Sequence, residues 1–363
     1  MRDNFERPKE IITGEAKEAG QEIFAAEIKN EVVWQNKDVD MPFRLEEGKP
    51  TKLGVFLVEH PQKRREGLKV RAFNEHFRSA LLGRVVFQDK EGRLYRDVDL
   101  KGMGGLDRRL EPKIRVEPLR PRRRSEQKYE TTWGILNWGY AENDRELSEF
   151  FTKEGLRTHR VLAIIRLDEV LDERGRKISV TEAREKGYIK KNEEPVIAIR
   201  AFGTKARISE IKNEALLKDA EKMVAQEFGI DPKKFSDKEY AEWFAKTLGE
   251  QVGRIHRLGY YHRYLTIHNV TLDCRIVDLD TVIKLPRNKE QRGKELIKED
   301  ITAVLDTIDF FDSCLNHPAG KRILGNLFWQ GYQQEVGEKF LSENPAIAKF
   351  IRGLQFLTPQ RNL

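Results

Sequence analysis

Short apolar runs dominate the first half of the chain, and each has the length of one β-strand. Bounded by turn-forming residues, such runs predict strands. Residues 94–100 alternate between apolar and polar positions, which predicts a strand with one mostly apolar face. The Asp-Lys-Glu-Gly turn at 89–92 joins this segment to the run before it, so we expect a β-hairpin. The runs are residues 53–58, 84–87, 161–165 and 196–199.

Helical periodicity takes over after residue 208, and the clearest helix is residues 236–258. Ser236 and Glu239 at its start have the spacing of a capping box, in which each side chain binds the backbone N–H of the other residue. Apolar residues then recur every three or four positions, as on the buried face of a helix. Gly259 follows directly and predicts the end of the helix.

Two further segments have helical spacing. Residues 143–156 begin with Asn143 and Glu146 at the spacing of a capping box. Residues 297–312 carry aspartates beside an apolar stripe. We expect this second helix to pack against its neighbours rather than to form a carboxylate metal site.

The order of these elements predicts an α+β protein with a two-lobed, protein-kinase-like plan: a strand-rich N-lobe and a helical C-lobe. We expect an N-terminal extension at residues 1–45, the N-lobe at 46–205 and the C-lobe at 206–363. Within the N-lobe, residues 103–130 are rich first in glycine and then in arginine, which predicts a loop. The arginines at 120–124 can bind an acidic protein or a polyanion, although acidic residues nearby favour a solvated loop.

The composition is that of a globular protein rich in charge, with 39% hydrophobic and 35% charged residues in a chain of 363. An excess of 67 Lys and Arg over 60 Asp and Glu suits an anionic ligand such as a nucleotide and does not indicate nucleic acid. The two cysteines, Cys274 and Cys314, predict no disulfide framework, so we expect a reducing, cytoplasmic location. No run approaches the roughly 18–20 apolar residues of a membrane span, and we expect no membrane partner.

The residues with the most evident chemistry lie in the second half of the chain. Residues 262–269 read H-R-Y-L-T-I-H-N, which resembles the protein-kinase catalytic loop H-R-D-L-x-x-x-N. Tyr264 stands where that loop has its aspartate, and Asn269 where it has a metal-binding asparagine. Asp278 follows a short apolar strand, as the magnesium-binding aspartate of kinases does. Because Mg²⁺ prefers hard oxygen ligands, Asn269 and Asp278 predict a Mg²⁺ or Mn²⁺ site; the alternative is a buried helix and hairpin with incidental polar residues.

Three side chains lie close to this pair in the sequence. His268 is either a proton acceptor, because an imidazole takes up a proton near neutral pH, or a hydrogen-bonded structural residue. Asp280 is either a second metal ligand or a cap for the segment that follows. We interpret Tyr264 as structural, since a phenol is a poor base near neutral pH.

Several short motifs resemble the selenoprotein O family, whose members have a protein-kinase fold and transfer AMP to protein hydroxyl groups. The interval from Asn269 to Asp278 is similar to the interval in that family. The likeness covers residues 84–285 in short islands. Besides the loop, the islands are residues 99–104 (D-L-K-G-M-G), 145–147 (R-E-L) and 157–162 (R-T-H-R-V-L).

The resemblance implies a site for ATP with Mg²⁺ or Mn²⁺. Lys101 would contact the phosphates, and Glu146 would orient that lysine, with Glu149 as the alternative on the same helix. Arg200 and Arg207 resemble the family's pair of phosphate-binding arginines and would bind the far end of the triphosphate. The acceptor would be a protein hydroxyl, and the sequence does not identify that protein.

One departure from the family pattern bears on the chemistry. The family has T-D-N where this chain has I-H-N at 267–269, so His268 replaces a base-like aspartate. Residues 277–281 also resemble the metal-binding strand of antibiotic and sugar kinases. The leading interpretation is AMP transfer by a kinase-like fold that lacks the H-R-D aspartate. The alternatives are phosphate transfer to a protein or small molecule and a nucleotide-binding scaffold without turnover.

Overall fold

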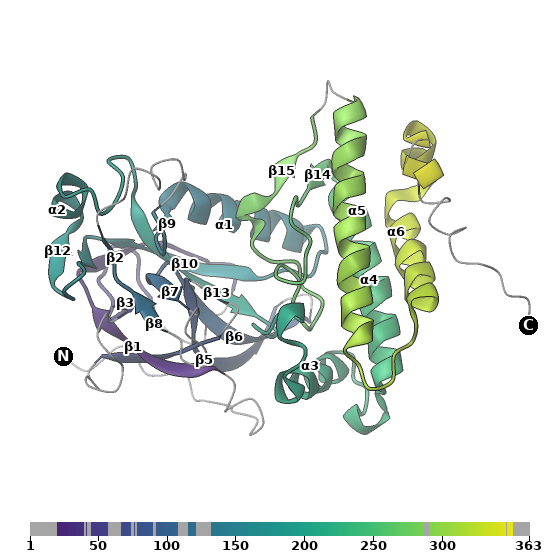
Figure 1. Ribbon diagram of the computed structural model, residues 1–363, viewed down its shortest axis with the longest axis horizontal. Coiled ribbons are helices and arrows are strands. Elements are labelled where there is room, and N and C mark those ends of the chain that lie inside the picture. The colour runs from purple at the N-terminus through teal and green to yellow at the C-terminus, as the bar shows by residue number, and fades with distance from the viewer. Residues whose placement is uncertain are drawn as a thin grey trace, which may run out of the picture. The chain divides into compact units, whose positions relative to one another are not determined.

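The chain forms two compact units, which we call unit 1 and unit 2. Unit 1 comprises Met1–Glu149 with His159–Lys205, and unit 2 comprises Phe150–Thr158 with Ala206–Leu363. Unit 1 consists mainly of strands and unit 2 mainly of helices, so the predicted α+β fold with a strand-rich first part and a helical second part is confirmed (Figure 1). The computed structural model describes residues 20–39, 41, 45–56, 67–73, 76, 78–89, 92–107, 115–120, 132–286, 290–345 and 347–350.

An antiparallel sheet makes up most of unit 1, and within the described part of the chain it has nine strands. The order is β2-β10-β13-β6-β5-β4-β1-β3, and β9 pairs with β13. The strands are β1 (Gln21–Glu27), β2 (Asn30–Gln35), β3 (Gly54–Phe56), β4 (Leu68–Ala72), β5 (Ser79–Gln88), β6 (Leu94–Lys101), β9 (Leu136–Asn137), β10 (Arg160–Leu167) and β13 (Pro195–Phe202).

Two small sheets and two helices complete the described part of unit 1. In these sheets β7 pairs with β8 and β11 pairs with β12. Helix α1 begins in unit 1 and runs past Glu149 into unit 2. These elements are β7 (Gly105–Asp107), β8 (Arg115–Glu117), β11 (Glu169–Leu171), β12 (Lys177–Ser179), α1 (Trp138–Lys153) and α2 (Val180–Glu185).

The predicted hairpin is confirmed, since β5 and β6 pair in antiparallel register. Within the predicted loop at 103–130, residues 105–107 and 115–117 form the strands β7 and β8, which pair with each other, whereas the described residues 103–104 and 118–120 are irregular. Gly102 and Gly104, with φ of 100° and 118°, bend the chain between β6 and β7, and a regular strand follows the bend. The described part of the extension predicted at 1–45 contains β1 and β2 of the main sheet. Residues 121–124 of the arginine cluster lie outside the described residues.

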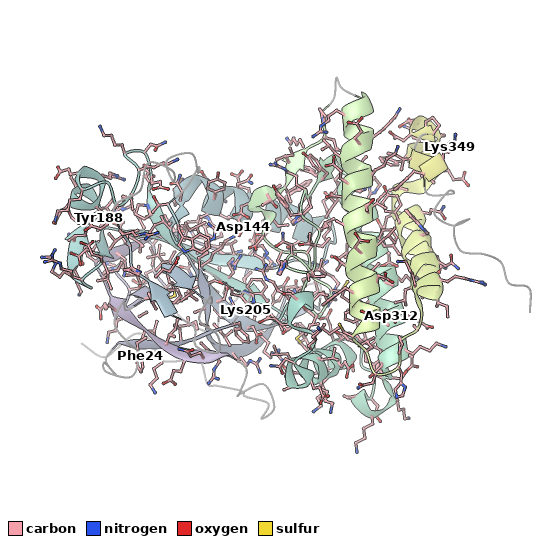
Figure 2. The ribbon with its side chains drawn as sticks, viewed as in Figure 1. Phe24, Asp144, Tyr188, Lys205, Asp312 and Lys349 are labelled. Atoms are coloured by element: carbon pink, nitrogen blue, oxygen red, sulfur yellow. The ribbon has the colours of Figure 1, made fainter. Side chains whose placement is uncertain are left out.

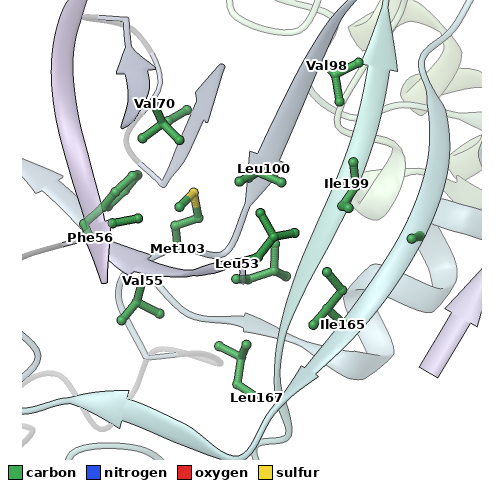
Figure 3. Close-up of a cluster of buried hydrophobic side chains, with 14 of the residues drawn as sticks. Leu53, Val55, Phe56, Val70, Val98, Leu100, Met103, Ile165, Leu167 and Ile199 are labelled. Atoms are coloured by element: carbon green, nitrogen blue, oxygen red, sulfur yellow. The ribbon is translucent and has the colours of Figure 1, made fainter. Parts of the chain in front are cut away.

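The core of unit 1 is a cluster of buried apolar side chains from the strands of the main sheet and from the segments next to them. Leu100, Ile199 and Ile165 lie on the neighbouring strands β6, β13 and β10 and are all fully buried (Figure 3). Full burial of such a side chain contributes about 1.5–3 kcal/mol. The runs 84–87, 161–165 and 196–199 and the alternating segment 94–100 thus lie within strands, as predicted. The run 53–58 contains β3, and its residues 57 and 58 lie outside the described residues.

Unit 2 is built mainly from helices, with a short two-stranded sheet of β14 and β15. In it, α4, α5 and α6 run side by side (Figure 1). The predicted capping box at Ser236 and Glu239 is present at the start of α4, and Gly259 follows its end with a φ of 80°. None of the helices in the described ranges is long and apolar enough to cross a membrane. The elements are α3 (Glu214–Glu227), α4 (Asp237–Arg257), β14 (Tyr260–Tyr261), β15 (Ile283–Lys284), α5 (Glu290–Ser313) and α6 (Lys321–Glu343).

Helices α4 and α6 pack with their backbones in close approach. A Cβ atom at Gly253 would lie 2.7 Å from the carbonyl oxygen of Tyr332, and one at Gly331 would lie 2.3 Å from that of Lys246. Only glycine leaves room for such contacts. The glycines therefore fix α6 against α4 and hold the backbone of Tyr332 in place.

Helix α1 starts earlier than the sequence predicts. Its first residue is Trp138 rather than a residue after Asn143, and Asn143 lies inside the helix. The backbone N–H of Trp138 donates to the carbonyl of Glu194 at 2.9 Å, which satisfies a group at the start of the helix without a side-chain cap. The prediction of a capping box at Asn143 and Glu146 is therefore wrong.

Candidate functional site

The two predicted metal ligands lie on adjacent segments of unit 2. The backbone N–H of Val277 donates to the carbonyl of Asn269 at 3.0 Å, which places Asp278 next to Asn269. The Asn269 Nδ2 group donates to the carbonyl of Tyr264 at 2.8 Å. Because this bond occupies the nitrogen end of the amide, the oxygen end is left to bind a donor or a cation.

One guanidinium group engages both predicted ligands. Arg207 donates from Nη1 to Asn269 Oδ1 at 3.2 Å and from Nη2 to Asp278 Oδ2 at 3.0 Å. Its Nη1 also donates to the carbonyl of His268. The side chain of Arg207 is 9% exposed and that of Asp278 is 22% exposed, so the pair is largely shielded from water. The structure thus brings Asn269, Asp278 and Arg207 together around one positive charge.

Asp278 holds a backbone conformation that few residues adopt. Its φ of 57° and ψ of 54° lie in the left-handed region. Aspartate tolerates this region better than most residues, and such conformations cluster at functional sites. The hydroxyl of Thr281 donates to the carbonyl of Asp278 at 3.0 Å, within the 3₁₀ turn Leu279–Thr281. Asp280 lies in the same turn, and both of its predicted roles remain open.

A buried carboxylate anchors the loop that precedes this pair. Asp300 on α5 accepts hydrogen bonds from the backbone N–H groups of His262 at 2.6 Å and Arg263 at 2.9 Å. His262 Nε2 lies 2.9 Å from the carbonyl of Val277, the residue before Asp278. Burial lowers the pKa of His262, so we assign the neutral ring with its proton on Nε2, where it donates to that carbonyl. The loop is therefore attached both to α5 and to the segment that carries Asp278.

The sequence predicted α5 as a packing helix and missed the role of Asp300. Asp300 is only 1% exposed although it is charged. It lies among Ile297, Ile301 and Val304, which occupy the apolar stripe of the helix. An acid within an apolar stripe is the signal that points to a buried hydrogen-bonding role.

The loop also presents exposed side chains. His268 is exposed, and its role as a proton acceptor remains a prediction. Tyr264 is 49% exposed, and the Arg263 guanidinium lies 5.5 Å from the centre of its ring. An aromatic ring with a cation over it thus stands where kinases have an aspartate.

Of the other predicted nucleotide-binding residues, Lys101 and Arg200 lie in a network of buried charges in unit 1, whereas Glu146 lies on the surface of α1. Arg200 on β13 donates from Nε and Nη2 to the two carboxylate oxygens of Asp99 on β6, at 3.0 and 2.9 Å. Lys205 donates to Asp99 Oδ2 at 2.5 Å and to Ser79 Oγ at 2.8 Å; its side chain is labelled in Figure 2. Burial alone would raise the pKa of Asp99, but the charges of Arg200 and Lys205 and their hydrogen bonds lower it to about 2. Arg200 is therefore part of a buried ion cluster.

This placement changes the interpretation of the two arginines. Arg200 belongs to unit 1 and is 1% exposed, whereas Arg207 belongs to unit 2. Asp99 already occupies two donors of the Arg200 guanidinium. Within the described residues the structure thus gives Arg200 the buried counter-ion Asp99, and its phosphate-binding role remains a prediction. Neither Asp99 nor Lys205 was predicted, because their partners lie far away in the sequence.

Glu146 does not orient Lys101. Its carboxylate is 64% exposed and accepts a hydrogen bond from Arg145 at 3.0 Å on the surface of α1. The buried acid of this helix is Asp144, 2% exposed and labelled in Figure 2. Residues two apart in a helix do not face the same way, so burial of Asp144 turns Glu146 outward. Lys101, at the end of β6, is itself buried, and its phosphate-binding role remains a prediction.

Asp144 takes part in the buried charge network of unit 1. Its carboxylate lies 3.1 Å from His159 Nε2 and 3.8 Å from Arg200 Nη1. Burial alone would raise the pKa of Asp144, but the charges of His159, Lys101 and Arg200 lower it. Asp144, and not Glu146, is therefore the acid of α1 whose pKa the charge of Lys101 lowers.

Glu149, the predicted alternative to Glu146, forms hydrogen bonds with residues other than Lys101. It accepts hydrogen bonds from Arg160 Nε at 2.7 Å and Nη2 at 2.5 Å, and from Asn36 Nδ2 at 2.9 Å. These partners account for both of its carboxylate oxygens. Glu149 thus ties α1 to β10 and to the end of β2.

No protein-family model and no curated protein matches the chain. Among solved structures, the chain is similar to WaaP in complex with acyl carrier protein, with 13% identity over 76% of this chain and 88% of the other, at a TM-score of 0.29. It is also similar to a rhoptry antigen kinase domain of Toxoplasma gondii, with 9% identity over 77% of this chain and 82% of the other, at a TM-score of 0.31. At these TM-scores neither likeness carries an argument about this chain.

Proposed function

We propose that the chain is a kinase-like, nucleotide-dependent transferase that moves AMP from ATP to hydroxyl groups of proteins. The observation that carries the proposal is the convergence of Asn269 Oδ1 and Asp278 Oδ2 on one cation, the guanidinium of Arg207. The loop that presents them, residues 262–269, has the spacing of a kinase catalytic loop. Its attachment to a buried aspartate of α5 supports a rigid site.

The donor set at this point fits a divalent cation. Mg²⁺ in nucleotide enzymes is bound by one or two protein oxygens and by the substrate phosphates and water. Asn269 and Asp278 would hold Mg²⁺ or Mn²⁺ in this manner, and the metal would neutralise charge on the triphosphate. In the part of the chain that the structure describes, no cluster of three or more His, Cys, Asp or Glu residues offers a richer metal site.

The remaining residues of the loop favour AMP transfer over ordinary phosphate transfer. Tyr264 replaces the aspartate that accepts the hydroxyl proton in protein kinases. In the proposed reaction an acceptor hydroxyl oxygen bonds to the α-phosphorus, the bond from the α-phosphorus to the bridging oxygen breaks, and pyrophosphate leaves. His268 is the side chain that we propose takes up the hydroxyl proton, because it is exposed next to Asn269.

Arg207 and a metal ion compete for the same two oxygens. Substitution of Arg207 by glutamine removes the competing charge, so we expect roughly tenfold tighter Mn²⁺ binding without nucleotide, as for loss of a charge-assisted hydrogen bond. Titration followed by electron paramagnetic resonance of free Mn²⁺ measures this affinity. Arg207→Lys, which keeps the charge, is the control and should stay closer to the wild type. Unchanged or weaker Mn²⁺ binding in Arg207→Gln would contradict the competition.

The proposed reaction is tested with ATP labelled separately at the α- and γ-phosphates, in the presence of Mn²⁺ and a mixture of acceptor proteins. We expect the α label on protein, and no label when Asp278 is replaced by asparagine. Transfer of the γ label alone would contradict AMP transfer and show that the protein transfers phosphate. Absence of both labels, with ATP bound, would leave a nucleotide-binding scaffold and overturn the transferase.

A further inference from the structure

Three buried polar side chains from three helices of unit 2 form a hydrogen-bonded series that ends at the backbone of residues 262 and 263. His256 on α4 lies between Tyr332 of α6 and Asp300 of α5. Its Nδ1 is 3.0 Å from Tyr332 Oη, and its Nε2 is 3.4 Å from Asp300 Oδ2. None of the three residues is more than 1% exposed. We propose that His256 and Tyr332 are positioning residues, which fix Asp300 and through it the loop that carries Asn269.

Each donor in this hydrogen-bonded series has an acceptor if every bond points toward Asp300. Asp300 has only acceptors, and it already receives the backbone N–H groups of His262 and Arg263. A proton on Nε2 of His256 adds a third donor to the same carboxylate, and Nδ1 is then free to accept from the Tyr332 hydroxyl. Burial and the charge of Asp300 raise the pKa of Tyr332, so its hydroxyl keeps the proton that it donates. The series of hydrogen bonds thus runs from Tyr332 through His256 to Asp300.

The loop needs this support because its backbone is strained. Arg263 has a φ of 75°, in the left-handed region that a long side chain rarely adopts. Such a conformation is energetically unfavourable and persists only where the surrounding structure imposes it. The hydrogen bond from the Arg263 N–H to Asp300 is one of the contacts that impose it. If Asp300 rotates, Arg263 can relax, and Asn269 moves with the loop.

Tyr332 is held rigidly enough to act as the first donor of this hydrogen-bonded series. The carbonyl of Tyr332 faces Gly253 of α4 so closely that a Cβ atom there would lie 2.7 Å away. The Tyr332 ring also packs edge-on against His256, with ring centres 5.7 Å apart. Both contacts limit the movement of the phenol. The hydroxyl of Tyr332 is therefore in a fixed position relative to His256.

The matched pair of variants is Tyr332→Phe and Tyr240→Phe. Both tyrosines are completely buried, and each loses one hydroxyl that donates a hydrogen bond. The Tyr240 hydroxyl donates to the carbonyl of Leu272 and makes no bond to Asp300. The two variants should thus lose a similar amount of overall stability, whereas only Tyr332→Phe should loosen the loop at residues 262–269.

The measurement is amide hydrogen exchange at His262 and Arg263, relative to amides in the centre of α4. We expect Tyr332→Phe to speed exchange at the two loop amides roughly threefold to tenfold over Tyr240→Phe, the factor for one lost neutral hydrogen bond. Equal relative exchange in the two variants would overturn the proposal.

The inference rests on the proposed function only for its consequence at Asn269, since the exchange measurement needs neither nucleotide nor turnover. Failure of ATP labelling in the wild type would overturn the proposed function and leave the positioning role intact. Equal loop exchange would remove the positioning role and leave the proposed function intact. The two results are therefore distinguishable.

Discussion

Replacement of Asp99 by asparagine is expected to lower the free energy of unfolding by about 3–5 kcal/mol, as for a buried ion pair that loses one partner. Asp99 is fully buried and faces two cations, Arg200 and Lys205, both of which would lose this counter-charge. Urea denaturation of the wild type and the variant measures the loss. Glu182→Gln, which breaks an exposed pair with Lys186, is the control and should change stability by less than about 1 kcal/mol.

A second variant separates lost charge balance from lost shape. Asp99→Asn combined with Lys205→Met removes one of the two cations that lose the charge of Asp99, so we expect it to recover part of the stability lost in Asp99→Asn. The double variant also keeps the prediction testable if the single variant fails to fold. A loss of less than about 1 kcal/mol in Asp99→Asn would show that the cations do not depend on this carboxylate.

The same carboxylate predicts how stability changes with pH. The pKa of Asp99 falls from an ordinary value of 3.8 to about 2 in the folded protein. Because the unfolded chain then binds a proton at higher pH than the folded one, the stabilisation is complete above about pH 4 and is lost as pH falls through about 2. The shift corresponds to about 2 kcal/mol. Acid titration of unfolding should show this loss in the wild type and a smaller one in Asp99→Asn.

Replacement of Asp278 by asparagine is expected to abolish the part of ATP binding that depends on metal. Asp278 is the one charged member of the proposed ligand pair, and asparagine keeps its shape while removing that charge. At ATP concentrations of 100 times Kd, binding stabilises the wild type by about 2.7 kcal/mol. We expect Asp278→Asn to lose the metal-dependent share of this stabilisation in a thermal-shift measurement with Mn²⁺.

The matched control for this variant is Glu146→Gln. Glu146 is 64% exposed, and its hydrogen-bond partner among the described residues is Arg145 on the surface of α1, so its neutralisation should leave ATP binding unchanged. If Asp278→Asn retains the full metal-dependent stabilisation, Asp278 is not a ligand. If Glu146→Gln loses that stabilisation, Glu146 has a role that its contacts do not explain.

The sequence predicts the elements whose burial is periodic. Strands β5, β6, β10 and β13 arise from apolar or alternating runs, and α4 arises from an apolar stripe between a capping box and a glycine. In each case the residues that decide the structure are neighbours in the chain. Local patterns suffice there because the buried face repeats with the period of the element.

The buried charges of unit 1 could not be predicted in this manner. In β6, the face that carries Asp97, Asp99 and Lys101 is as buried as the apolar face, although alternation alone suggests exposure to water. The reason is the register between strands, which places Arg200 directly across from Asp99 about a hundred residues away. A local pattern contains no information on such pairing.

In helix α1, which contains Asp144 and Glu146, the local sequence pattern does identify the buried acid. Asp144 lies on the same side of α1 as Ala141 and Ser148, both fully buried, at spacings of three and four residues. That spacing was visible in the sequence. The apparent capping box at Asn143 displaced the predicted start of the helix, and the family resemblance at residues 145–147 assigned the role to Glu146.

At the candidate site, the loop motif placed Asn269 and Asp278 side by side, whereas their contact with Arg207 could not be derived from spacing. Arg207 entered the sequence analysis only through a family resemblance, as a residue for the far end of a triphosphate. The structure instead shows its guanidinium between the two predicted ligands. Contacts between segments some sixty residues apart depend on the packed fold.

The central claim is that Asn269 and Asp278 form a metal-dependent site for ATP. Calorimetric titration of the wild-type protein with ATP, once with Mn²⁺ and once with EDTA, tests it most directly. We predict binding to one site that is at least about tenfold tighter with Mn²⁺, because the metal joins the two protein oxygens to the phosphates. Equal affinity under both conditions, or no binding under either, would contradict the claim.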